Sequence, residues 1–242
     1  VVTSGTFDGV HQGHQKILRQ VANMAQSKGL KSVVLTYWPH PRFVLHQDDQ
    51  SLKLLTTFDE KSKLIEETGI DYLVRIPFTE EFSQVAPADF VNRVLIHHLN
   101  TAKLVIGYDH HFGKDRKGNL AYLSANAAEF GFEVVEISRH DIDDVGVSST
   151  KIRTALLEGR VHDANSLLGR PYSLKGQVVE GDHLGRTIGF PTANIWVPEG
   201  YKLIPDEGVY ATRVVWQGKE LDGMTNIGIR PTVNGSQKRI EV

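Results

Sequence analysis

The stretch GTFDGVHQGHQKI, residues 5–17, decides how the first half of the chain is interpreted. It comes after a short apolar run and before a helical pattern with apolar side chains on one face. Gly5 and Gly9 suit a tight turn from a strand into a helix. His11 and His14 lie three residues apart at the helix start, beside free backbone N–H groups and the positive end of the helix dipole. This turn therefore predicts an anion site, and a polyphosphate is the ligand it favours.

The two histidines also have other interpretations. Gly13 between them lets an anion approach the backbone, and imidazoles can donate hydrogen bonds to phosphate oxygens during phosphoryl or nucleotidyl transfer. Helix-capping histidines on a solvated turn are an alternative. A zinc site is not favoured, because the histidines of metalloprotease helices lie four apart with a glutamate between them.

Short apolar strands alternate with helices over the first 150 residues. Strands are predicted at 1–5, 32–37, 72–76, 103–107 and 132–137. Helices are predicted at 14–27, from Thr57 with Glu60 at capping-box spacing, at 87–99 and at 119–131. Continuous Val/Ile/Leu strands in this alternation predict a parallel sheet covered on both faces. In such sheets ligands bind beyond the carboxyl ends of the strands.

The second half is different in character. From about residue 170 short β-rich runs are separated by Gly, Pro and Asn turns, which is typical of an antiparallel barrel or sandwich. Two short helices broken by Gly159 connect the halves. We therefore predict two domains, residues 1–160 and 161–242.

The composition narrows the class of protein. The 242 residues include 27 basic and 29 acidic side chains, which argues against a general nucleic-acid or membrane-surface binder. Cysteine is absent, and no apolar run approaches the length of a membrane span. We expect a cytoplasmic protein whose partners are small molecules, with no prediction of its oligomeric state. The chain begins on Val1 without Met and ends in a strand-like run, so we expect a piece of a longer protein.

Two further motifs of the first half follow predicted strands. In VSSTKIR, the hydroxyls of Ser148, Ser149 and Thr150 can cap a helix, and Arg153 follows one turn later, which together would form a second phosphate clamp. In GYDHHFG, Asp109 could accept a hydrogen bond from a ribose or an amino group. An ordinary N-cap and a solvated loop are the respective alternatives.

The second half carries one motif with metal chemistry. In GDHLGRTIGFPTANIWV, residues 181–197, Thr192 and Asn194 are expected to project to the same side of a strand. A hydroxyl and an amide carbonyl are hard oxygen ligands suited to Mg²⁺, and Arg186 and Thr187 could cover a phosphate chain. A plain hairpin is the alternative. Glu241 could take a proton from an attacking hydroxyl, although by composition alone it is one of many glutamates.

Taken together, these motifs resemble the family of bacterial bifunctional riboflavin kinase/FMN adenylyltransferases, the prokaryotic FAD synthetases. Its adenylyltransferase module is matched in order by GTFDGVHQGH, the PHP element, GYDHHFGKDRKG and VSSTKIR. Its riboflavin kinase module is matched in order by GRTIGFPTANI, GVYA, NIGIRPTV and RIEV. The resemblance covers nearly the whole chain, and GRTIGFPTAN is its most distinctive part.

The resemblance implies a fold and a set of roles. The fold is a Rossmann-like nucleotidylyltransferase sheet followed by an antiparallel Greek-key β-barrel, incomplete here because the family continues through more strands and a helix. The implied catalytic residues are His11, His14, Arg153 and Glu241. The adenylyltransferase ATP site would comprise Gly5, Phe7, His11, Gly13, His14, Asp109, Ser148, Ser149 and Thr150. The kinase ATP site would comprise Gly185, Arg186, Thr187, Thr192 and Asn194, and Thr192 and Asn194 would hold Mg²⁺.

The implied function is FAD synthesis in two steps, from riboflavin to FMN and from FMN to FAD, each with ATP. Two alternatives stay open from the residues. Another transferase with the HxGH motif would explain His11 and His14 but would leave GRTIGFPTAN without a role. A flavin-binding regulator without turnover would keep the fold, although the expected hydroxyls, imidazoles and carboxylate are all present.

Overall fold

The computed structural model describes residues 1–48, 51–107, 110–137, 146–181, 192–232 and 235–242. The chain divides into two compact units, Val1–Ser149 and Thr150–Val242, and each is described by itself. The domain boundary placed between residues 160 and 161 from the sequence stays a prediction.

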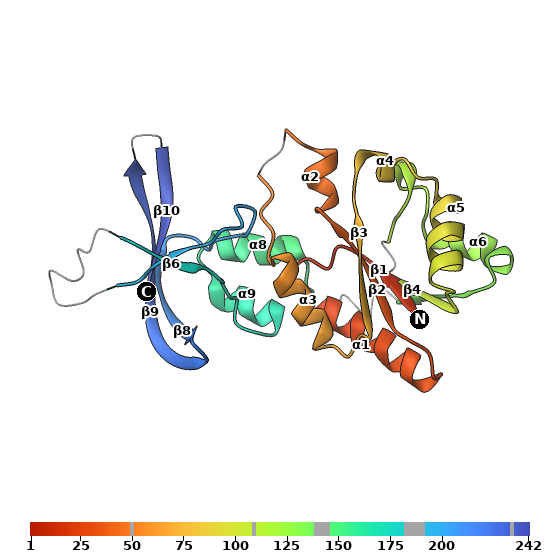
Figure 1. Ribbon diagram of the computed structural model, residues 1–242, viewed down its shortest axis with the longest axis horizontal. Coiled ribbons are helices and arrows are strands. Elements are labelled where there is room, and N and C mark those ends of the chain that lie inside the picture. The colour runs from red at the N-terminus through yellow and green to blue at the C-terminus, as the bar shows by residue number, and fades with distance from the viewer. Residues whose placement is uncertain (49–50, 108–109, 138–145, 182–191, 233–234) are drawn as a thin grey trace. The chain divides into compact units, whose positions relative to one another are not determined.

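The first unit is built on a parallel five-stranded sheet in the order β3-β2-β1-β4-β5 (Figure 1). Its strands are β1 (Val2–Ser4), β2 (Val33–Trp38), β3 (Tyr72–Pro77), β4 (Lys103–Gly107) and β5 (Glu133–Ile137). All neighbours pair in parallel, as the Val/Ile/Leu runs predicted. The chain moves outward from β1 to β3 and then returns to the other side of β1 with β4. The carboxyl ends of β1 and β4 therefore form the topological switch point, where such sheets bind ligands.

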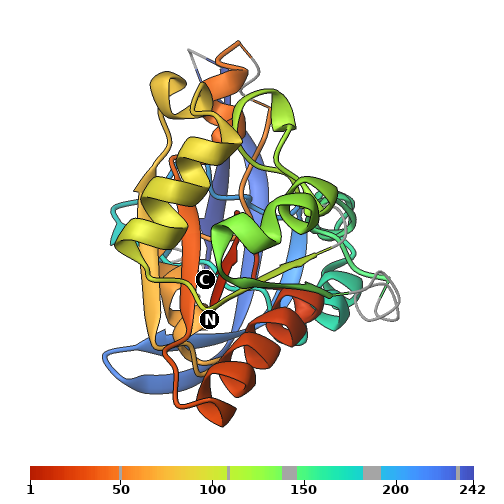
Figure 2. The ribbon, with the colours of Figure 1, turned by 90° about the vertical axis from the view of Figure 1, so that its right-hand side faces the viewer.

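Helices cover both faces of this sheet (Figure 2). They are α1 (Gln12–Ser27), α2 (Pro41–Leu45), α3 (Phe58–Glu66), α4 (Glu80–Ser83), α5 (Pro87–Phe90), the π-helix η1 (Val91–His98), the 3₁₀ turn η2 (Lys114–Arg116) and α6 (Leu120–Phe130). On one face, α1 and α3 pack with Val34 and Val105. On the other, α5, η1 and α6 pack with Leu35 and Ile106. Consecutive strand residues thus enter opposite cores, so both alternating sets of side chains in β2 and β4 are mostly apolar.

Local sequence signals explain where these helices begin and end. Thr57 and Glu60 form the predicted capping box: each side chain accepts a hydrogen bond from the other's backbone N–H. Gly131 ends α6 in the left-handed conformation. The helix predicted over 87–99 forms, but its later part widens into η1, where the Leu99 N–H donates to the Val94 carbonyl five residues back.

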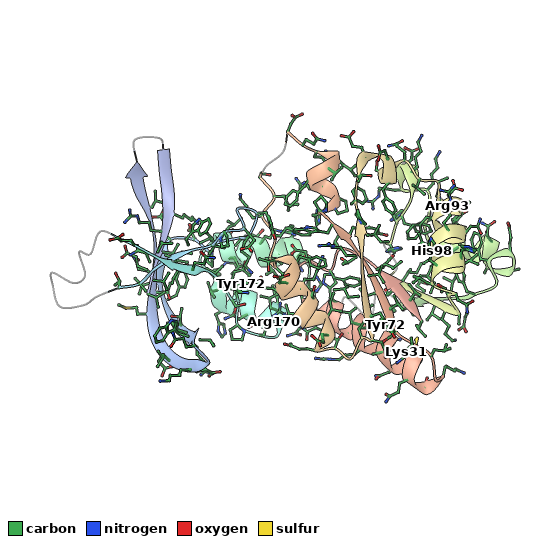
Figure 3. The ribbon with its side chains drawn as sticks, viewed as in Figure 1. Lys31, Tyr72, Arg93, His98, Arg170 and Tyr172 are labelled. Atoms are coloured by element: carbon green, nitrogen blue, oxygen red, sulfur yellow. The ribbon has the colours of Figure 1, made fainter. Side chains whose placement is uncertain are left out.

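The amino-terminal edge of the sheet is closed by polar contacts. Lys31 and Tyr72 lie at this edge, before β2 and at the start of β3 (Figure 3). The Asp71 carboxylate accepts from the Lys31 ammonium at 2.9 Å and from the Ser32 hydroxyl at 2.6 Å. These contacts join the residues that precede β2 and β3 at the amino-terminal edge of the sheet.

The second unit contains helices and an antiparallel sheet. Its elements are α8 (Ser149–Leu157), which starts at the last residue of the first unit, α9 (Val161–Leu168), β6 (Gln177–Val179), β7 (Asn194–Trp196), β8 (Gly208–Trp216), β9 (Lys219–Thr232) and β10 (Gly235–Glu241). The strand order β6-β7-β10-β9-β8 places β7 beside the last strand of a three-strand meander, which is a Greek-key connection. Over the part of the chain that the structure describes, β6 and β8 are open edges. This confirms an antiparallel β-sheet in the second unit, which does not close into a barrel within the described residues.

One face of the antiparallel sheet is packed and the other is open. Ile227 and Ile240 are opposite each other in β9 and β10, and both are buried, as is Leu203. Val209, which is opposite Asn226, and Met224 on β9 occupy alternate positions that point to the other face, and they are 65% and 69% exposed. Asn194 and Glu241 occupy this second, open face.

We expect Gly9→Ala to destabilise the first unit much more than Gly29→Ala. Both glycines have positive φ, +80° and +63°, where an L side chain costs about 1–2 kcal/mol. A Cβ at Gly9 would lie 2.7 Å from Cδ1 of Leu55, whereas a Cβ at Gly29 would meet nothing within 4 Å. The clash adds about 1–3 kcal/mol. Urea unfolding followed by tryptophan fluorescence measures both losses, and equal losses would contradict the close packing of this turn.

Candidate active sites

The turn between β1 and α1 adopts a strained backbone. Phe7 and Val10 have φ of +46° and +38°, in the left-handed region that non-glycine residues seldom occupy. Val10 is β-branched, so its conformation is a clear outlier. Such residues persist where the surrounding structure holds them in place, and they cluster at functional sites.

Asp8 anchors this turn to its surroundings. Its side chain is 4% exposed and accepts hydrogen bonds from the backbone N–H groups of Leu55, at 3.0 Å, and Thr56, at 3.2 Å. The Gly9 N–H donates to Oγ1 of Thr56 at 3.1 Å, and Oγ of Ser149 donates to the Asp8 carbonyl at 3.0 Å. The segment before α3 and the start of α8 thus converge on one residue of the turn.

His11 and His14 are arranged as a stacked pair at the mouth of α1. His11 is the N-cap residue, and its Nδ1 accepts from the backbone N–H of His14 at 3.3 Å. The two ring centroids are 3.6 Å apart, with 17° between the ring planes. The edge of Phe7 contacts the His14 ring, with centroids 5.2 Å apart. A Cβ at Gly13 would lie 3.1 Å from Val147 and 3.4 Å from the His11 ring, so a side chain at this position would crowd the stack.

The electrostatics of the pair favour a neutral His14. Burial lowers the pKa of His14 well below 6.5, and the nearby His11 and Lys61 lower it further. Its Nδ1 is buried and has no hydrogen-bond partner among the described residues. A buried polar atom without a partner is costly, so a bound ligand that completes its hydrogen bonding would stabilise the site.

Three polar side chains that the sequence did not single out meet at the switch point. Oγ of Ser4, at the end of β1, lies 3.1 Å from Nε2 of His110, which follows β4. The Ser4 side chain also hydrogen-bonds Tyr37, near the end of β2, and burial raises the pKa of Tyr37 to about 12. Each of these residues stands at the end of a predicted strand, which is the signal that could have found them. Asp109 lies outside the described residues.

The predicted hydroxyl-rich helix start is present. Ser149 is the first residue of α8, Ser148 precedes it, and both are half-buried. Thr150 is exposed, Arg153 follows one turn later, and these two residues belong to the second unit. The hydroxyl of Ser149 binds the turn itself, through the Asp8 carbonyl. The role of this segment as a phosphate clamp stays a prediction.

In the second unit, the structure brings Asn194 and Glu241 together. The two residues are directly opposite each other in the β7–β10 pair. The adjacent residues Ala193 and Val242 exchange both backbone hydrogen bonds, at 2.8 and 2.9 Å. The Asn194–Glu241 pair is therefore the non-hydrogen-bonded type, in which side chains on one face approach most closely. Asn226 on β9 is opposite Glu241 on its other side, so the three residues form one row.

Gly181 and Thr192 belong to the same sequence motif as Asn194. Thr192 is exposed and precedes β7, which begins at Asn194. A Cβ at Gly181 would lie 2.0 Å from Nδ2 of Asn194, so the asparagine side chain packs against bare backbone and requires a glycine there. Gly185, Arg186 and Thr187 lie outside the described residues. Within the described ranges, no cluster of three His, Cys, Asp or Glu residues could hold a metal ion.

The fold and these sites define the class of the protein. A parallel sheet whose first strand leads through an HxGH turn into a helix is the nucleotidylyltransferase type of α/β domain, and it precedes an antiparallel β unit. The FAD synthetase family model matches residues 1–151, and the riboflavin kinase family model matches residues 168–242. The chain belongs to the family of bifunctional riboflavin kinase/FMN adenylyltransferases.

Three relatives carry the name bifunctional riboflavin kinase/FMN adenylyltransferase. The protein of Listeria monocytogenes is 41% identical over 237 residues, which cover 98% of this chain and 74% of the relative. Those of Escherichia coli K12 and Bacillus subtilis are 38% and 40% identical, over 100% and 96% of this chain and 77% and 72% of their own lengths.

A solved structure shares the architecture. A crystal structure described as a macrolide-efflux protein from Streptococcus pneumoniae superposes with a TM-score of 0.85 at 30% identity, over 99% of this chain and 78% of that one. That description belongs to the Streptococcus protein. Among the described residues of the present chain, no helix has both the length and the apolar character needed to cross a membrane.

We expect the His14 imidazole to titrate well below pH 6.5. Because the folded protein then binds this proton less readily than the unfolded chain, the free energy of unfolding should fall as the pH drops through 6.5. The Cε1–H resonance of His14, assigned by its absence from a His14→Gln variant, reports the titration directly. In that variant the acid-induced loss of stability should be smaller. A midpoint at or above 6.5 would contradict a buried, neutral imidazole.

Proposed function

We propose that the chain makes FAD in two steps at two sites. The first unit transfers the AMP group of ATP to FMN, and the second phosphorylates riboflavin at its ribityl 5′-hydroxyl. The observation that carries the proposal is that each half presents its own polar site. One is the histidine turn at a parallel-sheet switch point, and the other is the Asn194–Glu241 pair on an antiparallel sheet.

At the first site, the phosphate of FMN attacks the α-phosphorus of ATP. The bond between the α- and β-phosphates breaks, and pyrophosphate leaves. His11 and His14 donate hydrogen bonds to the polyphosphate and offset the charge that builds on it, beside the N-terminus of α1. The stacked rings and the strained turn are held before substrate binds, so little reorganisation is needed during the reaction. Ser148 and Ser149, which belong to the same unit, are proposed to hold the same nucleotide.

At the second site, the riboflavin 5′-hydroxyl attacks the γ-phosphorus of ATP and releases ADP. Glu241 accepts the hydroxyl proton as the bond forms. Asn194, opposite Glu241 in the sheet, orients the phosphates, and Gly185, Arg186 and Thr187 are proposed to cover them.

The donor set of the second site fits Mg²⁺. Thr192 and Asn194 offer a hydroxyl and an amide oxygen, and Glu241 lies opposite Asn194. Mg²⁺ prefers few protein oxygens completed by phosphates and water, so a site without a cage of carboxylates suits it. Thr192 and Asn194 would hold the ion, whose chemistry is to neutralise charge on the transferred phosphoryl group.

The decisive assay measures the two reactions separately. FAD is followed from FMN and ATP, and FMN is followed from riboflavin and ATP, by chromatography of the flavin products. His14→Ala should lower FAD formation by about 100-fold and leave FMN formation unchanged, because a transition-state donor is lost at one site only. Asn194→Ala should lower FMN formation and leave FAD formation unchanged. Omission of Mg²⁺ should abolish FMN formation.

Matched controls separate these effects from general damage. His98→Ala and Asn92→Ala change exposed residues of η1 and should leave both activities at the wild-type level; Figure 3 shows His98 on this helix. A folded His14→Ala protein that loses both activities equally would refute the assignment of two sites. A wild-type protein that binds flavin but forms neither FMN nor FAD would instead support a flavin-binding regulator without turnover.

A further inference from the structure

Helix α3 carries a lysine where its amphipathic pattern calls for an apolar side chain. Lys61 is 5% exposed and lies one turn before the buried Ile65, on the same face. Its ammonium donates to the carbonyl oxygen of Thr6 at 3.1 Å and to Oγ1 of Thr36 at 3.0 Å. It also lies 5.4 Å from the centre of the Phe58 ring, within the range of a cation–π contact.

This buried charge is not balanced by a direct ion pair. Among the described residues, no carboxylate lies within ion-pair distance of the Lys61 ammonium, and its hydrogen-bond acceptors are neutral oxygens. The nearest attracting carboxylate is that of Asp8, which the backbone N–H groups of Leu55 and Thr56 already engage. A buried ammonium is costly in free energy, so an apolar side chain would suit stability better at this position.

The contacts of Lys61 lead directly to the histidine turn. Thr6 immediately precedes Phe7, where the strained part of the turn begins and whose ring contacts His14. Thr36 belongs to β2, the strand beside β1. Lys61 therefore links α3, the turn and a neighbouring strand, and it fixes the peptide that enters the strained conformation.

We propose that Lys61 is a positioning residue of the first nucleotide site, which holds the strained turn in place and adds a buried positive charge behind His11 and His14. The inference rests on the adenylyltransferase function proposed above and assigns a residue to it. The bound polyphosphate would be the anion that compensates the charge. Lys61 does not itself touch the reacting atoms in this arrangement.

The ammonium is expected to matter only while it is charged. Burial lowers the pKa of Lys61 to about 8, with Asp8 acting in the opposite direction. The charged and titratable groups around it are Asp8 in the turn, His14 in α1 and Arg75 in β3, whose guanidinium lies 5.1 Å from the Phe58 ring. His14 is neutral above pH 7, and a guanidinium keeps its charge. Loss of activity with a midpoint near pH 8 would therefore report Lys61.

The test compares pH profiles of FAD formation from FMN and ATP between pH 7 and about pH 9.5. In the wild type, kcat/KM should fall with a single deprotonation near pH 8. Lys61→Met should lower kcat/KM at pH 7 by about tenfold, less than the loss of a direct donor, and should remove the alkaline fall. Lys63→Met changes an exposed lysine of the same helix and should keep the wild-type profile. FMN formation from riboflavin should be unchanged in both variants.

Thr36→Val keeps the result decisive if Lys61→Met does not fold. This variant retains the Lys61 ammonium but removes the Thr36 hydroxyl, one of the two hydrogen-bond acceptors of that ammonium. It should lower kcat/KM of FAD formation about threefold at pH 7, which is the effect of weakening one hydrogen bond. A folded Lys61→Met with wild-type kcat/KM and an intact alkaline fall would overturn the proposal. If Lys61→Met is unfolded, a Thr36→Val protein with the kcat/KM of the wild type would also overturn the proposal. A wild type that forms no FAD at any pH would instead refute the adenylyltransferase function.

Discussion

The first site depends on the hydrogen bonds that hold residues 6–10 in a conformation the backbone does not favour by itself. Positive φ at Phe7 and Val10 costs free energy, and that cost is met by contacts made from outside the turn. The Asp8 carboxylate accepts hydrogen bonds from the N–H groups of Leu55 and Thr56, and the Thr6 carbonyl accepts one from the Lys61 ammonium. The position of the histidine pair at the mouth of α1 follows from this anchoring.

This anchoring explains why the segment between β2 and β3 matters to a site formed by β1 and α1. The capping box at Thr57 fixes where α3 begins, and so fixes where Thr56 and Lys61 stand. The same residues therefore serve helix initiation, core packing and the shape of the turn. The second site has a simpler origin, because register alone places Asn194, Glu241 and Asn226 in one row across three strands. Its precision comes from the pairing of Ala193 with Val242, one residue further along.

The two sites illustrate different uses of a sheet. In the parallel sheet, both faces are covered by helices, and ligands of such sheets bind at the edge where the strands end. In the antiparallel sheet, one face is packed and the other can carry polar groups along a row of cross-strand neighbours. The two units thus present their polar groups differently, one at the edge of a sheet and the other on a sheet face.

Much of this protein could be derived from its sequence, because the determining signals are local. Apolar periodicity predicted each strand of the parallel sheet and most helices, and the Thr57–Glu60 spacing predicted the capping box. These features depend on residues within one or two turns of one another. The anion site at the start of α1 stays a prediction. The pairing of Asn194 with Glu241, the anchoring of the turn by Asp8 and the contacts of buried Lys61 join residues 25 or more positions apart. Such contacts are decided by strand order, register and helix packing, so only the tertiary structure could reveal them.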